Sequence, residues 1–304
     1  MRFPARVRGR SLRCLKTRGT LAIIFMLVLF PSCNAPEGVA KFCSSAVTTL
    51  KTGDAIFDDM KASCIREAET RDPFGAFPLS DATPAVCEET GKKAEGLKDV
   101  SKIVSRYYTA LNDLASFGSA KSGGDSAKAK SGDDSKSPAS NISAKAKLTD
   151  ARSKALESVV GFLTKIATSG YQQKHLADDI TRTHDDIRAV LEGLSEAASD
   201  VYIQQLDDEE HKTLTRYKAF LLEHPNDAGA LLTLDSRWQA DRAGFEVKRK
   251  AARAYRAALE AMAKGEDDLA AHAHGLSEKD LSGLLSPYSA EMQSLTPTIQ
   301  KAFI

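Results

Sequence analysis

Residues 176–201 read LADDITRTHDDIRAVLEGLSEAASDV, and their apolar side chains keep one spacing throughout. The steps between successive members alternate between four and three residues. This is the heptad period of helices that pack along a shared seam. The stretch therefore predicts a long helix with one continuous packing face. Its seam positions are Leu176, Ile180, Thr183, Ile187, Val190, Leu194, Ala197 and Val201.

A second seam with the same alternation runs through residues 231–276. Only Asp241, Lys248 and Glu266 place polar side chains on it. A seam of this length predicts a second long helix. Its apolar positions are Leu231, Leu234, Trp238, Phe245, Ala252, Tyr255, Leu259, Met262, Leu269, Ala273 and Leu276.

The two seams are separated by a turn at residues 224–227, which read His-Pro-Asn-Asp. The first seam fails at Gln204, Gln205 and the polar residues 207–212, where we expect a solvated hinge, and resumes at Leu214. Two heptad helices joined by a short turn predict an antiparallel hairpin. At 1.5 Å per residue, each arm approaches roughly 65–75 Å.

The remaining chain also favours helices, because few of its residues are aromatic and Ala, Leu, Lys and Asp are common. Helical spacing predicts one helix from residue 39 to about 69. Thr83 and Pro84 resemble a cap and first-turn proline for the next helix. The predicted fold class is all-α, an elongated helical bundle with a long antiparallel coiled-coil-like hairpin.

Composition divides the predicted bundle into two helical parts. Residues 33–117 form an N-terminal helical hairpin, and residues 148–304 form a C-terminal long-helix bundle. Residues 118–147 contain almost no large apolar side chain, so they predict a flexible low-complexity linker. A last helical piece starts near Ser277, and Pro287 and Pro297 are expected to interrupt it.

The N-terminus has the features of an export signal. Residues 2–18 contain seven basic residues and no acidic one, and the apolar run Leu21 to Phe30 follows. That run is about half the roughly 20 residues needed to cross a bilayer as a helix. A basic segment followed by a short apolar segment predicts a secretory signal peptide over residues 1–32.

Ser32-Cys33, directly after the apolar run, resembles the lipobox of bacterial lipoproteins. The family prefers Leu three residues before the cysteine, where this chain has Phe30. The resemblance implies lipidation of Cys33, which becomes the first residue of the mature chain. Because Asn34 is not the Asp that retains such proteins at the inner membrane, the resemblance implies the outer membrane, facing the periplasm.

Ordinary cleavage nearby, for example after Ala40, is the alternative to lipidation. Removal of residues 1–32 takes away seven basic residues, which leaves 35 basic against 41 acidic residues and a net charge of −6. Nucleic-acid binding depends on neutralising phosphates, so an acidic mature chain predicts no nucleic-acid partner.

The exported chain keeps Cys43, Cys64 and Cys87 in a compartment that permits disulfides. On one helix, Cys43 and Cys64 lie about 31 Å apart, whereas a disulfide needs Cα atoms within about 7 Å. Cys64 and Cys87 fall near the same end of a helical hairpin, so we predict that they are bonded. Cys43 is then either a free buried thiol or the site of an intermolecular bridge.

No catalytic or metal-binding pattern rises above chance, so we predict no enzyme, cofactor or metal site. His272 and His274 are two residues apart and point about 200° from each other on a helix, so they cannot chelate one ion. His175, His184 and His211 lie beside carboxylates, which is more typical of a solvated helix surface.

Two hypotheses follow for the function. The first is a non-enzymatic, lipid-anchored envelope protein with a structural or protein-interaction role, whose partner is another envelope protein or a second copy. The alternative is a periplasmic helical module that binds a small molecule between helices. A deep apolar cavity lined by Tyr107, Tyr108 or Trp238 favours the alternative.

Overall fold

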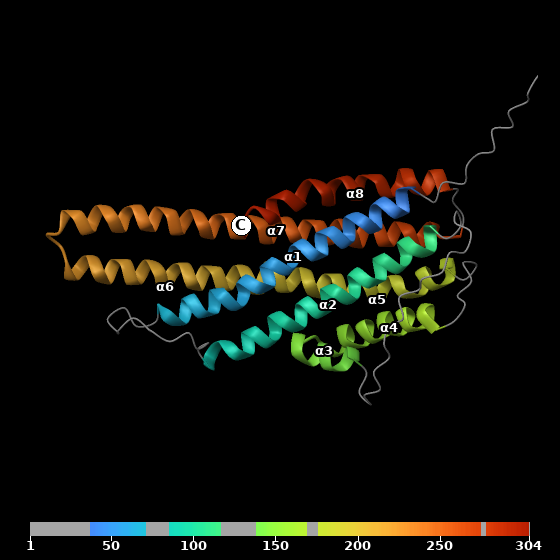
Figure 1. The fold of residues 1–304 in the computed structure, drawn as a ribbon, viewed down its shortest axis with the longest axis horizontal. Coiled ribbons are helices and arrows are strands. Elements are labelled where there is room, and N and C mark those ends of the chain that lie inside the picture. The colour runs from blue at the N-terminus through green and yellow to red at the C-terminus, as the bar shows by residue number, and fades with distance from the viewer. Residues whose placement is uncertain (1–36, 71–84, 117–137, 169–175, 275–277, 304) are drawn as a thin grey trace, which may run out of the picture. The chain divides into compact units, whose positions relative to one another are not determined.

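The computed structural model describes residues 37–70, 85–116, 138–168, 176–274 and 278–303. The predicted signal peptide and Cys33 lie outside these ranges. The described residues form an all-α bundle without strands, as predicted (Figure 1). Its helices are α1 (Glu37–Glu69), α2 (Ala85–Ser116), α3 (Pro138–Ala146), α4 (Asp150–Thr168), α5 (Leu176–Glu196), the π-helical segment η2 (Ala197–Val201), α6 (Tyr202–Glu223), α7 (Ala228–His272) and α8 (Glu278–Gln300).

Helices α1 and α2 form the predicted N-terminal hairpin. Their packed faces contain fully buried Phe42, Leu50 and Tyr108. The Ser101 hydroxyl donates to the Leu50 carbonyl across the pair. Among the helices that the structure describes, none is long and apolar enough to cross a membrane.

Helices α5, η2 and α6 form one continuous helical arm, and α7 is the other arm of the predicted hairpin (Figure 1). The turn lies at residues 224–227, where Asp227 Oδ1 accepts a hydrogen bond from the Ala230 amide at 2.9 Å and caps α7. The expected interruption at residues 204–212 was wrong, because these residues are helical. Five of their polar side chains, those of residues 205, 207, 209, 210 and 212, have partners on other helices.

Helices from the two predicted parts share one core. Helix α1 packs on α6, α7 and α8, and α2 packs on α4 and α5. Helices α1 and α7 approach each other closely at Gly265 of α7. A Cβ added there would lie 2.3 Å from the ring of Phe42 in α1, so glycine leaves the room that this ring needs. The apolar stripes of the N-terminal hairpin are therefore buried by the C-terminal helices.

The last part of the predicted linker is helical. Residues 138–146 form α3, which packs on α2 and α4, and residues 117–137 lie outside the described chain. Small side chains replace large apolar ones at this contact. Ala139 and Ala146 are buried, and a Cβ at Gly96 of α2 would lie only 2.3 Å from the Ala146 nitrogen. Low content of large apolar residues therefore did not prevent burial.

Helix α8 continues through Pro287 and Pro297, which were expected to interrupt it. A proline inside a helix removes one backbone hydrogen bond. Here α8 packs on both α1 and α7, and it buries Leu285, Met292 and Ile299 completely. We attribute its continuity to this burial, which offsets the lost hydrogen bonds.

Candidate functional site

The distal part of the α6–α7 hairpin, residues 213–244, is the least covered part of the described bundle. Helices α1 and α8 end before the turn, so the two arms continue beyond them (Figure 1). Six large apolar side chains are exposed within the described ranges, and four of them lie in this hairpin segment. These four are Phe220, Leu222, Leu231 and Leu232.

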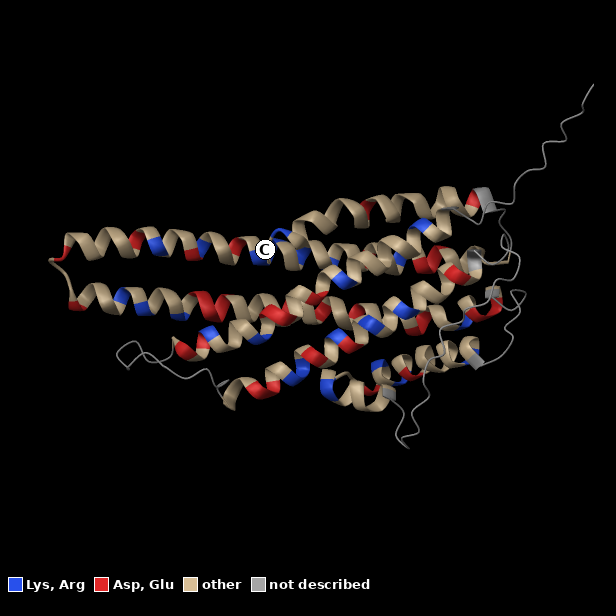
Figure 2. Cartoon of the chain, in the orientation of Figure 1, with Lys and Arg blue, Asp and Glu red and all other residues tan. Residues whose placement is uncertain are grey.

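A cleft of about 1030 Å³ lies between the arms and ends against the last turn of α1. Its lining combines aromatic and aliphatic side chains with charges of both signs, and Figure 2 shows both signs along these helices. We call it the hairpin cleft. The apolar lining residues are Phe220, Leu234, Ala240, Gly244 and Phe245, with Tyr217 beside them; the charged ones are Arg66, Glu69, Glu209, Arg216, Glu223, Arg237, Asp241 and Lys248.

The floor of the hairpin cleft contains a buried ion pair between α1 and α6. The carboxylate of Glu209, only 3% exposed, accepts hydrogen bonds from Ser63 Oγ at 2.6 Å and Arg66 Nη2 at 3.1 Å. Arg66 also donates to Asp59 at 3.2 Å. Loss of one member would leave an unpaired buried charge, so this network fixes α1 against α6.

Asp59 connects the same network to α7. It accepts hydrogen bonds from the Tyr202 hydroxyl at 2.6 Å and from Lys248 Nζ at 2.9 Å. Burial alone would raise the pKa of Asp59, but the Tyr202 hydrogen bond and the cations Arg66 and Lys248 outweigh burial and lower it. Lys248, a polar exception in the second seam, is thus the partner of a carboxylate on α1.

Several side chains of residues 204–212, a segment expected to be solvated, instead contact helices α1 and α7. Gln205 donates to the Met60 carbonyl at 2.6 Å, and Lys212 pairs with Glu67 of α1. Arg249 of α7 donates to Asp207 at 2.8 Å and also pairs with Glu210. Sequence spacing does not predict these partners, because they lie on other helices and are 39 to 146 residues away along the chain.

Asp241, another polar exception in the second seam, supports the wall of the hairpin cleft. It accepts a hydrogen bond from the Tyr217 hydroxyl at 2.5 Å, and Arg237 lies 3.4 Å from it. The Tyr217 ring packs edge-on against Trp238 with centroids 6.1 Å apart. The hydrogen bond and the ring contact join the two arms on one side of the hairpin cleft.

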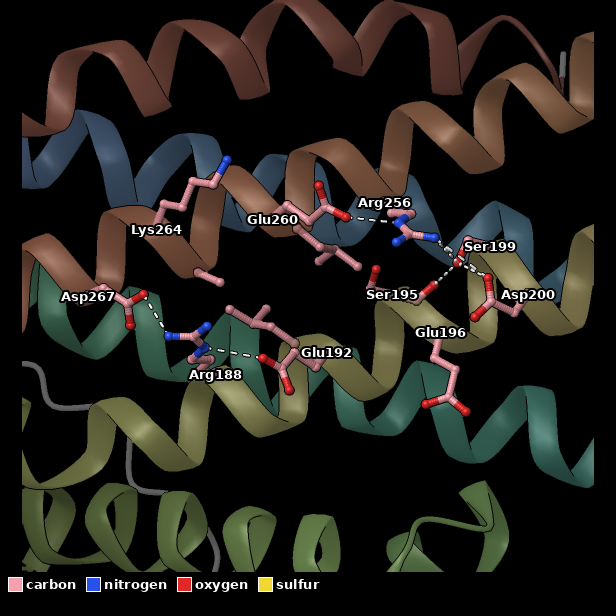
Figure 3. A pocket seen from close by; sticks show the side chains of 13 residues that line it. Arg188, Glu192, Ser195, Glu196, Ser199, Asp200, Arg256, Glu260, Lys264 and Asp267 are labelled. Atoms are coloured by element: carbon pink, nitrogen blue, oxygen red, sulfur yellow. Dashed lines mark hydrogen bonds and ion pairs between the residues drawn. The ribbon is translucent and has the colours of Figure 1, made fainter.

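A second, smaller groove of about 420 Å³ lies between α5, η2 and α7 (Figure 3). Arg188 pairs with Glu192 on its own helix at 3.1 Å and with Asp267 across the groove at 3.0 Å. Arg256 repeats the arrangement with Glu260 at 2.8 Å and Asp200 at 3.6 Å. Both arginines are therefore compensated by carboxylates of this chain.

The sequence analysis missed this groove, although a short internal repeat marks it. Residues 188–194 read RAVLEGL and residues 256–262 read RAALEAM. The repeats lie on packed antiparallel helices, so each Arg faces the acidic residue that follows the other repeat. Exposed ion pairs of this kind contribute little stability, and the groove is the weaker site candidate.

Glu266, the third polar exception in the second seam, is completely buried between α2 and α7. The Tyr107 hydroxyl donates to its carboxylate Oε1. Its Oε2 and the neighbouring Tyr108 hydroxyl have no hydrogen-bond partner among the residues that the structure describes. Burial raises the pKa of Glu266 to about 7, although hydrogen bonding from Tyr107 works against this rise.

The cysteines of the N-terminal hairpin lie as follows. Cys64 and Cys87 are bonded, with Cα atoms 5.8 Å apart, as the hairpin geometry predicted. Cys43 is free and completely buried, and burial raises the pKa of its thiol. Burial of Cys43 supports the free-thiol interpretation, because an intermolecular bridge would require α1 to leave the core.

The histidines that the structure describes are not assembled into a site, and His175 lies outside the described residues. His272 Nδ1 lies 2.9 Å from the Asp268 carbonyl, and His274 lies 3.4 Å from Asp178. His184 lies beside Asp185, and His211 is exposed. Within the described ranges, no three His, Cys, Asp or Glu side chains are grouped as metal ligands would be.

No protein-family model, curated protein or solved structure matches this chain.

Proposed function

We propose that this chain is a lipid-anchored cell-envelope protein that binds another envelope protein through the distal part of the α6–α7 hairpin. The role is non-enzymatic, and the anchor is a lipid on Cys33 at the outer membrane, facing the periplasm. The proposal rests on two separate features, which are the N-terminal sequence and the exposed hairpin segment. Each has its own test.

The observation that carries the binding role is the position of the exposed apolar side chains. Leu222 and Leu232 are 82% and 75% exposed, and Phe220 and Leu231 lie in the same segment. Several exposed apolar side chains within one segment mark a binding site more often than a single scattered apolar residue does. Two helices alone do not enclose a core, so a partner that covers this segment completes the packing.

Lipidation is tested by intact mass of the protein purified from its bacterial membrane. We expect the mass of a chain that starts at Cys33 and carries a lipid group, and we expect Cys33→Ala to abolish the added mass. An unlipidated chain that starts after residue 33 would contradict the anchor and would leave a soluble periplasmic protein.

Partner binding is tested with a photoreactive amino acid at Phe220 or Leu232 in the full chain, expressed in bacteria. We expect discrete crosslinks to an envelope protein, identified by mass spectrometry. The matched control is Gly161 on α4, which is exposed and lies on a helix that does not line the hairpin cleft. Equal products from all three positions, or none from the hairpin positions, would contradict the binding role.

A small-molecule role for the hairpin cleft is the second candidate. Its volume of about 1030 Å³ is near the upper end of the roughly 300–1,000 Å³ typical of ligand pockets. Of the aromatic residues expected to line such a cavity, Tyr107 and Tyr108 are fully buried in the core. Trp238 contacts Tyr217 at the wall of the hairpin cleft, so its fluorescence would report a bound small molecule.

A further inference from the structure

Helices α1, α2 and α7 meet around a polar side chain in the core. Glu266 of α7 is completely buried, and the Tyr107 hydroxyl of α2 donates a hydrogen bond to its Oε1. Beside it, Phe42 of α1 lies against Gly265 of α7 and packs edge-on against Tyr108 of α2, with ring centroids 5.8 Å apart. We call these five residues the Glu266 junction, where the α1–α2 hairpin contacts α7 around a carboxyl group.

The surroundings of Glu266 favour its neutral form. A buried carboxylate is stable only where donors or a cation compensate its charge. Here Oε1 accepts from Tyr107, whereas Oε2 has no hydrogen-bond partner among the residues that the structure describes. The Tyr108 hydroxyl is also unpaired within that part of the chain. Ionisation of Glu266 in the closed core would therefore create a charge that the junction compensates at one oxygen only.

The titratable groups that face Glu266 come from α2, α5 and α7. Burial is the largest influence on the pKa of Glu266 and raises it to about 7. Tyr107 and Tyr108 of α2 oppose this rise, and His184 of α5 opposes it less. Asp267 of α7 adds a small further rise. The charges around the junction therefore do not reverse the effect of burial.

The free thiol of Cys43 on α1 lies at the same junction. Cys43 follows Phe42 in the chain and is completely buried. Burial raises the pKa of this thiol, and the charge of Glu266 adds to the rise, so the two groups are close. An opening between α1 and α7 that brings water to Glu266 therefore also exposes Cys43.

We propose that Glu266 is a pH-sensitive switch that controls local opening between α7 and the α1–α2 hairpin. Protonated Glu266 keeps the junction closed. When its proton passes to the solvent, the carboxylate is hydrated only where α1 and α2 separate locally from α7, so opening becomes more frequent. The opening is transient and leaves the rest of the bundle folded. The inference is independent of the proposed binding function, because it uses no residue of the distal hairpin.

The direction and the pH range of the switch follow from its two states. In the closed state the pKa of Glu266 is about 7, and in the hydrated open state it returns toward its usual value of 4.5. Opening is therefore increasingly favoured as the pH rises from about 4.5 to 7, and it is constant above about 7. The difference between these two values limits the change in the opening equilibrium to about 300-fold.

The test measures how fast a dipyridyl disulfide, which reacts with thiols in acid as well as at neutral pH, modifies Cys43. It uses residues 33–304 with Cys33→Ser, so that Cys43 is the free thiol beside the Cys64–Cys87 bridge. Glu266→Gln is the matched variant, because its amide has the same shape and does not ionise. Division of the two rates at each pH removes the pH dependence of the thiol reaction itself.

We expect the ratio of the rates, unmodified chain over Glu266→Gln, to rise at least about tenfold between about pH 5 and 7 and to stay constant above. Tyr107→Phe removes a donor that favours ionised Glu266, so the rise should extend to higher pH. A purely structural role of Tyr107 would leave the pH profile where it is. His184→Gln should retain the rise.

A second thiol position distinguishes local opening from unfolding of the whole chain. Ala252 of α7 is completely buried and lies 14 residues from Glu266, or about 21 Å along the helix. In a chain with Ala252→Cys and Cys43→Ser, we expect no rise of the rate ratio with pH. Modification of Cys43 should also be insensitive to low urea concentrations, because local opening exposes little surface.

Three results would overturn the inference. Equal pH profiles for the unmodified chain and Glu266→Gln would show that Glu266 does not control the opening. Loss of the rise in His184→Gln would assign the pH response to His184. An equal rise at Ala252→Cys, together with a steep acceleration by urea at both positions, would show that the thiols react through global unfolding.

Discussion

The hydroxyl of Tyr107 on α2 donates a hydrogen bond to the carboxylate of Glu266 on α7 in the completely buried core. Burial raises the pKa of Glu266 to about 7, above its usual value of 4.5. Nearby His184 lowers the pKa and Asp267 raises it, but both effects are smaller than that of burial. The folded chain therefore holds Glu266 protonated over a pH range in which the unfolded chain does not.

This pKa shift predicts a decline in stability as the pH rises. Between about pH 4.5 and 7 the folded state binds a proton that the unfolded state has lost, so the free energy of unfolding falls with rising pH and levels off above about 7. In the unmodified chain the free energy of unfolding falls by roughly 3 kcal/mol between the two ends of this pH range, and Glu266→Gln removes that fall. Urea unfolding at several pH values measures it, and identical slopes for both chains would contradict the prediction.

Removal of the Glu209 carboxylate is expected to destabilise the fold strongly. Glu209→Ala leaves Arg66 with Asp59 as its remaining carboxylate partner and removes the acceptor of the buried Ser63 hydroxyl, which costs about 3 kcal/mol. Asp208→Ala is the control, because Asp208 is exposed on the same helix. Thermal unfolding measures both variants. A similar, small effect of the two changes would show that residues 204–212 behave as a solvated segment.

The contact between α2 and α3 predicts opposite effects for two glycine substitutions. Gly96→Ala places a Cβ 2.3 Å from the Ala146 nitrogen, so α3 must move and stability falls by about 2 kcal/mol. Gly161→Ala has open space and gains up to about 1 kcal/mol from helix propensity. Chemical denaturation measures the difference. Equal gains from both substitutions would mean that α3 does not pack closely on α2.

Reduction of the Cys64–Cys87 bridge is expected to lower stability by about 3 kcal/mol, because the bridge closes a loop of 23 residues in the unfolded chain. The double variant Cys64→Ser/Cys87→Ser should have the stability of the reduced chain and no response to reductant. Buried Cys43 provides the internal check, since alkylation under native conditions should leave it unmodified. A reductant-sensitive double variant would point to another bridge.

Local periodicity was sufficient to predict α1, α2 and the two arms of the hairpin, but it did not predict α3. The alternation of three and four residues from Leu176 to Val201, and again from Leu231, predicted α5 and α7. The turn at residues 224–227 and the position of Cys64 and Cys87 at one end of a hairpin also followed from spacing. These features depend on neighbours within a few turns, so the amino-acid sequence by itself determined them.

The partners of the polar residues depended on the tertiary structure. Lys248, Glu266 and the segment 204–212 looked like defects in the seams, yet each meets a group on another helix, as in Glu209 with Arg66 143 residues away. Spacing does not encode such distant partners. The same is true of α3, which is buried through the close approach allowed by Gly96. The hairpin cleft also depends on the tertiary structure, because it lies where the last turn of α1 meets the two arms, which are far apart from α1 in the sequence.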